Sequence, residues 1–263
     1  MSIITIIAAD GGVGKTINAQ RFPESLAYVD FEFPKGKKCL KLHNSDRLIT
    51  LFPCRELCGY KIINKNDDFV FEKTKVQTGE IKGQIDYQKT YNKIIETINI
   101  LRDTSDEYET IVFDSISDIR NIVAAQWLSN YRKKDKDKAN RKVIGKDPSA
   151  WAAINKTVCD DLLFPIINIG RAEEKNIIFT VKNEDEYKLI ALESGKEEMA
   201  KSGKRVMDCQ NWLTFEIDII VKLTVSETGR YFMECPKTPK IAIKKTEITN
   251  KNLYDVLVEA GIV

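Results

Sequence analysis

The sequence predicts an α/β protein: a mostly parallel sheet flanked by helices, with an antiparallel extension at its C-terminal end. Strand-like and helix-like segments alternate over the first two thirds of the 263 residues. The early strands are short and continuously apolar, which is typical of strands buried on both faces of a parallel sheet. Strand patterns then cluster towards the end of the chain. We therefore expect one domain over residues 1–263.

The strands are expected from runs of apolar and β-branched residues that are bounded by turn-forming residues. In the alternating part of the chain, these runs occupy residues 2–8, 26–31, 110–113 and 176–181. Three later runs occupy residues 218–225, 230–235 and 240–244. The turn Glu227-Thr228-Gly229 separates the first two of these, and strands joined by so short a turn are antiparallel.

Helices are expected where apolar residues recur at helical spacing or where proline and glycine mark an end. The first helix covers residues 15–21 and ends before Pro23. A later helical face is formed by Tyr87, Tyr91, Ile94, Ile95, Ile98 and Leu101. Further helices are predicted over residues 119–131, from Pro148 towards Ile169 with a kink or an end at Pro165, and over residues 252–260 before Gly261.

Two segments lack a regular pattern. Residues 34–75 contain charged, Cys-bearing and Gly-bearing stretches, and we interpret about 34–80 as an insertion after the second strand. Residues 182–205 are polar without a clear period. Neither segment is assigned to the sheet.

Composition excludes some classes of protein. Lys and Arg number 41 against 39 Asp and Glu, so net charge does not favour bulk nucleic-acid binding. No apolar stretch approaches the length of a membrane span, and no basic region precedes the first apolar run. We therefore expect no membrane contact, a cytoplasmic location, and six cysteines that are thiols rather than a disulfide framework.

A glycine-rich loop follows the first strand. It reads Asp10-Gly11-Gly12-Val13-Gly14-Lys15-Thr16 and opens a helix. Such a loop turns backbone N–H groups towards phosphate oxygens, its lysine reaches the β- and γ-phosphates, and its hydroxyl ligates Mg²⁺. Ala9 stands where the motif has its first glycine, and a simple turn before an ordinary helix is the alternative. The predicted phosphate-binding residues are Gly11, Gly12, Val13, Gly14, Lys15, Thr16 and Ile17.

A second clue is the strand Thr110-Ile111-Val112-Phe113, which ends in Asp114. A carboxylate at the end of a buried strand beside a phosphate loop is placed to hold Mg²⁺, together with Thr16. The alternative is that Asp114 only caps the next helix.

A third clue is Tyr28-Val29-Asp30-Phe31-Glu32 at the end of the second strand. A phosphate loop, a strand ending in Asp-x-Glu and an Asp-terminated strand, in this order, resemble the RecA-like ATPases. The resemblance implies that Glu32 polarises the attacking water, in an ATP- and Mg²⁺-dependent hydrolase. The alternative for Glu32 is an exposed residue at a strand end.

The same resemblance extends to two later positions. The end of the strand at residues 176–181 is where the group senses the γ-phosphate; RecA has Gln there, whereas this chain has Lys182, with Thr180 and Asn183 as neighbouring candidates. Lys237 resembles a lysine that reaches the nucleotide of a neighbouring subunit. The alternative for Lys237 is a solvated lysine in a Pro-bearing turn.

More narrowly, the chain resembles phage-type nucleotide-binding proteins of RecA fold, which act in single-strand annealing or recombination. This implies assembly into a ring or filament and work on single-stranded DNA. Two basic segments are candidate DNA contacts, residues 132–142 and 196–205, flanked by Tyr131 and Tyr187. A charge run is otherwise a solvated loop.

Residues 39–58 contain a possible zinc site. Cys39 and His43 form one pair, and Cys54 and Cys58 form another, at spacings compatible with tetrahedral Zn²⁺. The alternative is that the cysteines are buried as small apolar residues.

Two other functions remain open from the sequence. The first is a nucleotide-gated switch or assembly factor that binds a protein partner and hydrolyses slowly. The second is a kinase for a small acceptor, with residues 182–205 as a substrate lid. Base preference is not encoded in the loop, since the loop contacts only phosphates.

Overall fold

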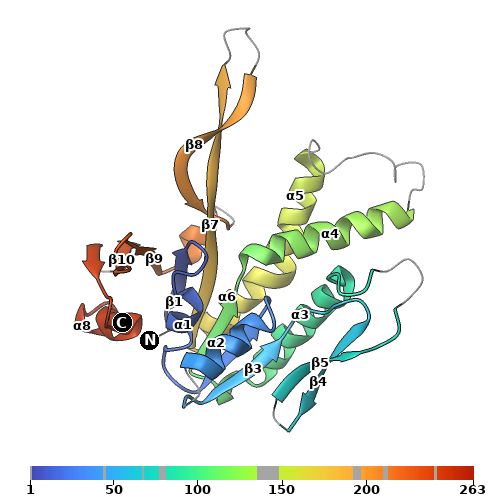
Figure 1. Ribbon diagram of the computed structural model, residues 1–263, viewed down its shortest axis with the longest axis horizontal. Coiled ribbons are helices and arrows are strands. Elements are labelled where there is room, and N and C mark those ends of the chain that lie inside the picture. Colours follow the sequence, from blue (N-terminus) through green and yellow to red (C-terminus); the bar gives the residue numbers. More distant parts are fainter. Residues whose placement is uncertain are drawn as a thin grey trace.

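The computed structural model describes residues 2–43, 46–66, 68–76, 81–134, 148–191, 197–209, 213–239 and 242–263. Within them, a nine-stranded sheet forms the centre of the molecule (Figure 1). Its main path runs β11-β10-β9-β1-β7-β6-β2-β3, and β8 pairs with β7. The strands are β1 (Ile4–Ala9), β2 (Leu26–Asp30), β3 (Ile49–Pro53), β6 (Thr110–Asp114), β7 (Asn176–Ala191), β8 (Glu197–Met207), β9 (Ile219–Val225), β10 (Tyr231–Lys237) and β11 (Ile243–Glu247).

Strand directions confirm the predicted fold class. From β9 to β3 every neighbouring pair on the main path is parallel. The pairs β9–β10 and β10–β11 are antiparallel and form the C-terminal extension. Strand β1, which precedes the glycine-rich loop, and the Asp-terminated strand β6 both pair with β7, so their carboxyl ends meet at one edge of the sheet.

Helices cover both faces of the sheet. They are α1 (Lys15–Ala19), α2 (Lys35–His43), α3 (Tyr87–Asp103), α4 (Ser117–Lys134), α5 (Pro148–Thr157), α6 (Phe164–Ala172), α7 (Leu213–Glu216) and α8 (Leu253–Glu259), with a short 3₁₀ turn at Ser105–Glu107. A π-helical segment, Val158–Leu163, joins α5 to α6, and Pro165 lies in the first turn of α6. The helical segment thus does not end at Pro165 but continues to Ala172, and the irregularity near the proline is the π-helical turn that precedes it.

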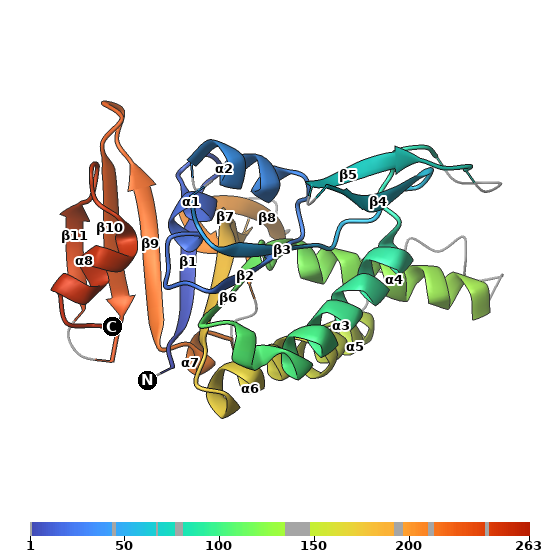
Figure 2. The ribbon, with the colours of Figure 1, turned by 90° about the horizontal axis from the view of Figure 1, so that it is seen from below.

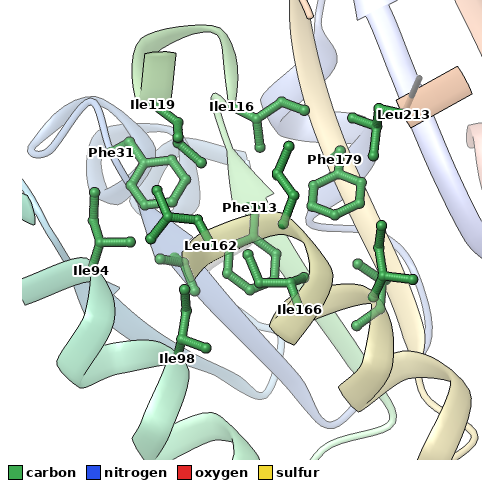
Figure 3. Close-up of a cluster of buried hydrophobic side chains, with 14 of the residues drawn as sticks. Phe31, Ile94, Ile98, Phe113, Ile116, Ile119, Leu162, Ile166, Phe179 and Leu213 are labelled. Carbon is green, nitrogen blue, oxygen red and sulfur yellow. The ribbon is translucent and has the colours of Figure 1, made fainter. Parts of the chain in front are cut away.

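Alternation along the strands divides the core into two clusters. Ile4 and Ile6 of β1 face one cluster, and Ile3 and Ile7 face the other. Figure 2 shows α1 and α2 on one side of the sheet and α3, α5 and α6 on the other. The larger cluster contains Phe31, Ile94, Phe113 and Phe179 (Figure 3), packed between the sheet and the helices. Both faces of the central strands are thus buried, as continuous apolar runs predict.

The interpretation of residues 34–80 as an insertion is wrong for its first half. Helix α2 and strand β3 continue the parallel sheet, since β3 pairs with β2 in register from Leu26 with Ile49 to Asp30 with Pro53. Only the hairpin of β4 (Tyr60–Lys65) and β5 (Asp68–Lys73) forms a separate two-stranded sheet. The edge position of β3 leaves it partly exposed, so it lacks the continuous apolar run of a central strand.

Residues 182–205 also differ from expectation. Strand β7 continues past the sheet to Ala191 and pairs with β8 in an antiparallel hairpin, which projects from the body as an arm (Figure 1). A two-stranded ribbon with solvent on both faces needs no apolar alternation, which explains the missing period. We call Asn183–Met207, without residues 192–196, the β7–β8 arm.

Among the described residues, no helix is both long and apolar enough to cross a lipid bilayer.

Candidate functional site

The glycine-rich loop lies between β1 and α1 at the carboxyl edge of the sheet. Gly12 and Gly14 have φ values of 78° and 85°, which L side chains rarely adopt. The Lys15 side chain is buried, and its Nζ donates to the backbone oxygens of Ala9 and Asp10, both at 2.8 Å. Burial lowers the pKa of Lys15, and nearby Asp114 opposes that shift. The loop is thus bent into a cradle around its own lysine.

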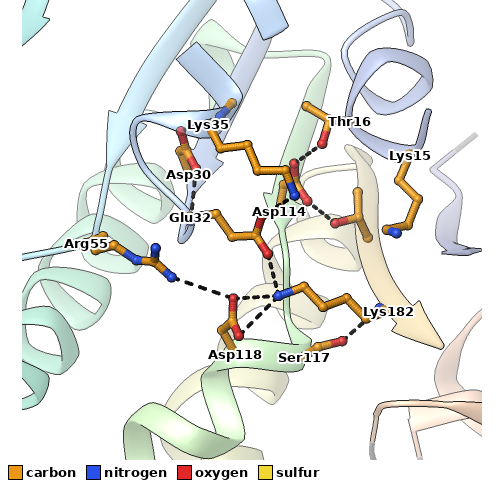
Figure 4. A network of polar contacts seen from close by, with 12 residues as sticks. Lys15, Thr16, Asp30, Glu32, Lys35, Arg55, Asp114, Ser117, Asp118 and Lys182 are labelled. Carbon is orange, nitrogen blue, oxygen red and sulfur yellow. Dashed lines mark hydrogen bonds and ion pairs between the residues drawn. The ribbon is translucent and has the colours of Figure 1, made fainter. Parts of the chain in front are cut away.

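Asp114, at the end of β6, accepts hydrogen bonds from three hydroxyl groups. Thr16 Oγ1 donates to Asp114 Oδ2 at 2.6 Å, as Figure 4 shows. Tyr28 Oη donates to the same oxygen, and Thr180 Oγ1 donates to Oδ1. These donors come from α1, β2 and β7, so three elements besides its own strand fix this carboxylate. Thr16 and Asp114 are therefore adjacent, as the sequence predicts.

Glu32 follows β2 on the opposite side of the cavity. Its carboxylate forms ion pairs with Lys35 and Lys182 (Figure 4). Burial alone would raise the pKa of Glu32, but the two lysines lower it to about 2. Glu32 is therefore ionised and held by positive charge.

Asp30 accepts hydrogen bonds from the backbone of the turn that carries Glu32. Its Oδ1 accepts from Glu32 N at 3.0 Å, and its Oδ2 accepts from the backbone N–H groups of Gly36 at 2.9 Å and Lys37 at 3.3 Å. Burial, followed by the charge of Asp114, raises the pKa of Asp30 to about 7. Asp30 thereby fixes the turn that presents Glu32 and Lys35.

A chain of ion pairs leads away from Glu32. Lys182 Nζ contacts Asp118 Oδ2 at 3.1 Å and Oδ1 at 3.3 Å, and Asp118 lies 4.0 Å from Arg55. The backbone of Lys182 is fixed as well, because its N–H donates to Ser117 Oγ at 2.8 Å. Burial would lower the pKa of Lys182, but Glu32 and Asp118 raise it.

These side chains surround one cavity of about 170 Å³. It is lined by Gly12, Val13, Gly14, Lys15, Thr16, Ile17, Glu32, Lys35, Cys39, Asp114, Ser115 and Lys182. Six of the seven predicted phosphate-loop residues line it, and Gly11 does not. Ser115 Oγ is buried and lacks a hydrogen-bond partner within the described residues, which leaves a hydroxyl for a polar ligand. The hydroxyl oxygen of Thr16 and the carboxylate oxygens of Asp114 are ligands that suit Mg²⁺.

Comparison with known proteins agrees with this geometry. The model of the AAA domain family matches residues 2–246, which include every residue of the cavity. The chain belongs to the AAA domain family. An AAA domain indicates a nucleotide-binding ATPase of the P-loop class. A search of curated proteins found no match.

Within this AAA domain, sequence reasoning missed several residues that line the cavity or contact the side chains that line it. Lys35 lies three residues after Glu32, and Asp118 lies four residues after Asp114 in the first turn of α4. Tyr28 sits two residues before Asp30 on β2. Spacing from the predicted carboxylates could have singled out all three, but only tertiary contacts show that they converge.

Lys237 lies at the end of β10, away from the residues that line the cavity. Its Nζ donates to the backbone oxygens of Thr214 at 2.7 Å and Phe215 at 3.3 Å, in α7. Of the γ-phosphate-sensor candidates, Lys182 lines the cavity and Thr180 binds Asp114. Asn183 instead accepts from Arg205 through its backbone oxygen at 2.8 Å.

The zinc prediction is wrong for the described residues, in which no group of three or more His, Cys, Asp or Glu side chains could hold a metal ion. Cys54 and Cys58 are buried, and Cys54 Sγ lies 3.4 Å from Thr97 Oγ1. Cys39 lines the nucleotide cavity, and His43 is exposed at the end of α2. Cys54 packs in the core as a small apolar side chain.

Of the two basic segments predicted to contact DNA, the structure describes most of the second but little of the first. Residues 135–142 of the first segment lie outside the described part of the chain, and so does Lys196 of the second. Residues 197–205 belong to β8 of the β7–β8 arm. At the base of the arm, Arg205 forms ion pairs with Asp10 of the phosphate loop at 2.9 Å and with Asp185 at 2.8 Å.

Proposed function

We propose that this AAA domain hydrolyses ATP in a Mg²⁺-dependent reaction. The observation that carries the proposal is the pairing of Thr16 with Asp114 at one side of a cavity whose other side is formed by Glu32. Lys15 and the backbone of the glycine-rich loop bind the β- and γ-phosphates. Bound Mg²⁺, held by Thr16 and Asp114, would neutralise charge on the phosphates.

Glu32 is the proposed base. Its carboxylate orients a water towards the γ-phosphate and accepts the water's proton as the water oxygen bonds to phosphorus, while the bond from phosphorus to the β–γ bridging oxygen breaks and ADP leaves with that oxygen. A carboxylate with a pKa of about 2 is a weak base near neutral pH, because the best catalytic pKa lies near the working pH. The ion pairs with Lys35 and Lys182 therefore hold Glu32 in a low-activity state until those lysines find another anion.

The γ-phosphate is that anion in our proposal. Lys35 and Lys182 line the same cavity as the phosphate loop, so an incoming triphosphate competes with Glu32 for both. The side chain of Lys35 is 63% exposed and that of Lys182 is 38% exposed, which leaves both room to move. This gating also supports the second candidate, a slowly hydrolysing nucleotide-gated switch that binds a protein partner.

The work on single-stranded DNA, and assembly into a ring or filament, are finer proposals. The β7–β8 arm supports the first, because its exposed Tyr187 lies opposite Lys201 in the strand pairing and Lys188 is the next residue along β7. Each lysine is paired with a carboxylate, Glu186 or Asp185, which a DNA phosphate would have to displace. Its base contacts the phosphate loop through Arg205 and Asp10. For the second, Lys237 would act on a neighbouring subunit's nucleotide after leaving the carbonyl groups of α7.

Glu32→Gln tests the hydrolysis. We expect Mg²⁺-dependent ATP turnover to fall about 100-fold or more, because the variant cannot accept a proton. Binding of a fluorescent ATP analogue should persist. Glu109→Gln is the matched control, since Glu109 is exposed beside β6. Wild-type turnover in Glu32→Gln would remove Glu32 from the mechanism.

A DNA titration separates the two candidates. Turnover that rises several-fold with single-stranded DNA in the wild type, and not in Lys188→Ala/Lys201→Ala, supports the recombination role. Turnover that ignores DNA favours the switch and directs the search to a protein partner.

A further inference from the structure

A second cavity adjoins the nucleotide cavity. Its volume is about 420 Å³, and it is lined by Arg55, Ile85, Tyr87, Thr90, Asp118, Asn121 and Ile122. These residues come from the loop after β3, the start of α3 and the first turns of α4. The cavity therefore lies at the carboxyl ends of β3 and β6, the edge at which open α/β sheets bind ligands. Its size suits a small molecule.

The loop that carries Arg55 is fixed by backbone hydrogen bonds of the following residue, Glu56. Glu56 N donates to Thr90 Oγ1 at 3.1 Å, and Asp86 N donates to the backbone oxygen of Glu56 at 2.9 Å. The loop is thus tied to α3 at both groups. Arg55 itself is held in place by the backbone rather than by partners of its guanidinium.

The guanidinium of Arg55 has N–H groups that can bind a ligand. Within the described residues, its one ion pair is the contact with Asp118 at 4.0 Å, which is too long for a hydrogen bond. A guanidinium presents five N–H groups in a planar fork that matches the two oxygens of a carboxylate or phosphate. Ile85 and Ile122 add apolar surface beside it, and Tyr87 adds an aromatic ring.

Arg55 is also connected to the proposed base. Figure 4 shows the ion pairs in sequence from Arg55 to Asp118, from Asp118 to Lys182, and from Lys182 to Glu32. Asp118 lines the second cavity, and Lys182 lines the nucleotide cavity. The ion pair of Asp118 with Lys182 thus joins a residue of one cavity to a residue of the other.

We propose that the second cavity is an effector site for a small organic oxyanion, whose phosphate or carboxylate group binds Arg55 and whose binding frees Glu32 for hydrolysis. The proposal rests on the proposed ATPase function. An anion on Arg55 draws the guanidinium from Asp118, so the charge of Asp118 is left to Lys182 alone. Lys182 then moves towards Asp118 and weakens its hold on Glu32, which becomes the stronger base.

Binding is tested first, on the full chain with its nucleotide cavity filled. Mg²⁺ and a non-hydrolysable ATP analogue occupy the phosphate loop, and calorimetry then measures binding of phenyl phosphate and of benzoate. We expect saturable binding of at least one probe, and at least a tenfold weaker affinity in Arg55→Met. Arg230→Met is the control, because Arg230 is an exposed arginine paired with Glu247. A phosphate ligand is indicated when only phenyl phosphate binds, and a carboxylate ligand when only benzoate binds.

Two binding results overturn the proposal. One is the absence of saturable binding for both probes when the analogue itself binds. The other is unchanged affinity in Arg55→Met, with an unfolding midpoint like that of the wild type. Failure of the analogue to bind instead counts against the nucleotide site, and calorimetry without the analogue then decides the effector site alone.

The coupling is tested with Asp118→Asn. The probe that binds should stimulate wild-type ATP turnover several-fold. Asp118→Asn should bind the probe at least as tightly, since it lacks the competing charge, yet show no stimulation. Stimulation that survives in Asp118→Asn would overturn the relay. Transfer of the γ-phosphate to the probe would also overturn it, because the cavity would then hold an acceptor rather than an effector.

Discussion

The two sides of the nucleotide cavity are held in different ways. Asp114 is fixed by hydroxyl groups, and two of its donors, Tyr28 and Thr180, are fully buried. Glu32 is fixed by the ammonium groups of Lys35 and Lys182, which remain partly exposed. Neutral donors buried in the core are shielded from acceptors in solvent, whereas partly exposed lysines exchange partners when a stronger anion arrives. The side proposed to hold the metal is therefore preorganised, and the side proposed to activate water is adjustable.

The largest expected effect comes from removing the fixed side. Asp114→Ala should reduce Mg²⁺-dependent turnover by about 100-fold or more, because metal-assisted charge stabilisation contributes several kcal/mol. It also leaves the buried hydroxyls of Tyr28 and Thr180 without their acceptor, so the unfolding midpoint should fall. Asp103→Ala, at an exposed carboxylate, is the control for assay and melting curve. Turnover within about threefold of the wild type would contradict the metal role.

The next largest effect is expected at Gly36, which packs against Asp30 and Tyr28. A Cβ on Gly36 would lie 2.8 Å from Asp30 Oδ2 and closer still to Tyr28. Gly36→Ala should therefore lower the free energy of unfolding by about 1–3 kcal/mol, the usual range for overpacking. Gly11→Ala is the matched control, because nothing lies within 4 Å of its Cβ position. Denaturant unfolding without nucleotide measures the stability of both variants. Equal midpoints would show that Asp30 and Tyr28 shift to make room for the added methyl group.

The pH dependence of stability separates Asp30 from Glu32. The folded-state pKa of Asp30, about 7, exceeds its usual 3.8, so the folded protein binds this proton more tightly than the unfolded chain. Its contribution is fully present below pH 3.8 and is lost as pH rises through 7. For Glu32 the sign is opposite: with a pKa of about 2, its contribution is present above pH 4.5 and is lost as pH falls through 2.

Asp30→Asn isolates the first of these contributions. Between pH 5 and pH 7 the wild type should lose about 2 kcal/mol of unfolding free energy relative to Asp30→Asn, at about 1.4 kcal/mol per pKa unit. Urea unfolding at both pH values gives the difference directly. A difference that stays constant with pH would mean that Asp30 is ionised throughout.

The smallest effect is expected at the base of the β7–β8 arm, where Arg205 pairs with Asp10. Arg205 and Asp10 are both about half exposed, so solvent screens their ion pair and it should contribute little to folding. Arg205→Ala should leave the unfolding midpoint nearly unchanged, as should the control Arg230→Ala. A drop of several degrees in Arg205→Ala alone would show that the β7–β8 arm is tied to the phosphate loop more firmly than an exposed pair allows.

Much of the fold could be predicted from local patterns. The strands that end at Ala9, Asp30 and Asp114 are continuous apolar runs, and burial on both faces leaves them no other pattern. The edge strand β3 and the β7–β8 arm could not be predicted, because strands exposed to solvent have no such constraint. The zinc prediction was wrong for a related reason, since spacing along the chain does not show which cysteines enter the core.

The sequence by itself determined the phosphate loop, its lysine, and the carboxylates Asp114 and Glu32 as neighbours, because parallel strands place their ends at one edge of a sheet. Only the tertiary structure decided how these groups are held. Lys35, Asp118 and Lys182 come from separate elements, and their charges act on Glu32 through distances of a few ångströms that no spacing in the sequence encodes. Whether the proposed base is free or paired is therefore a property of the folded chain.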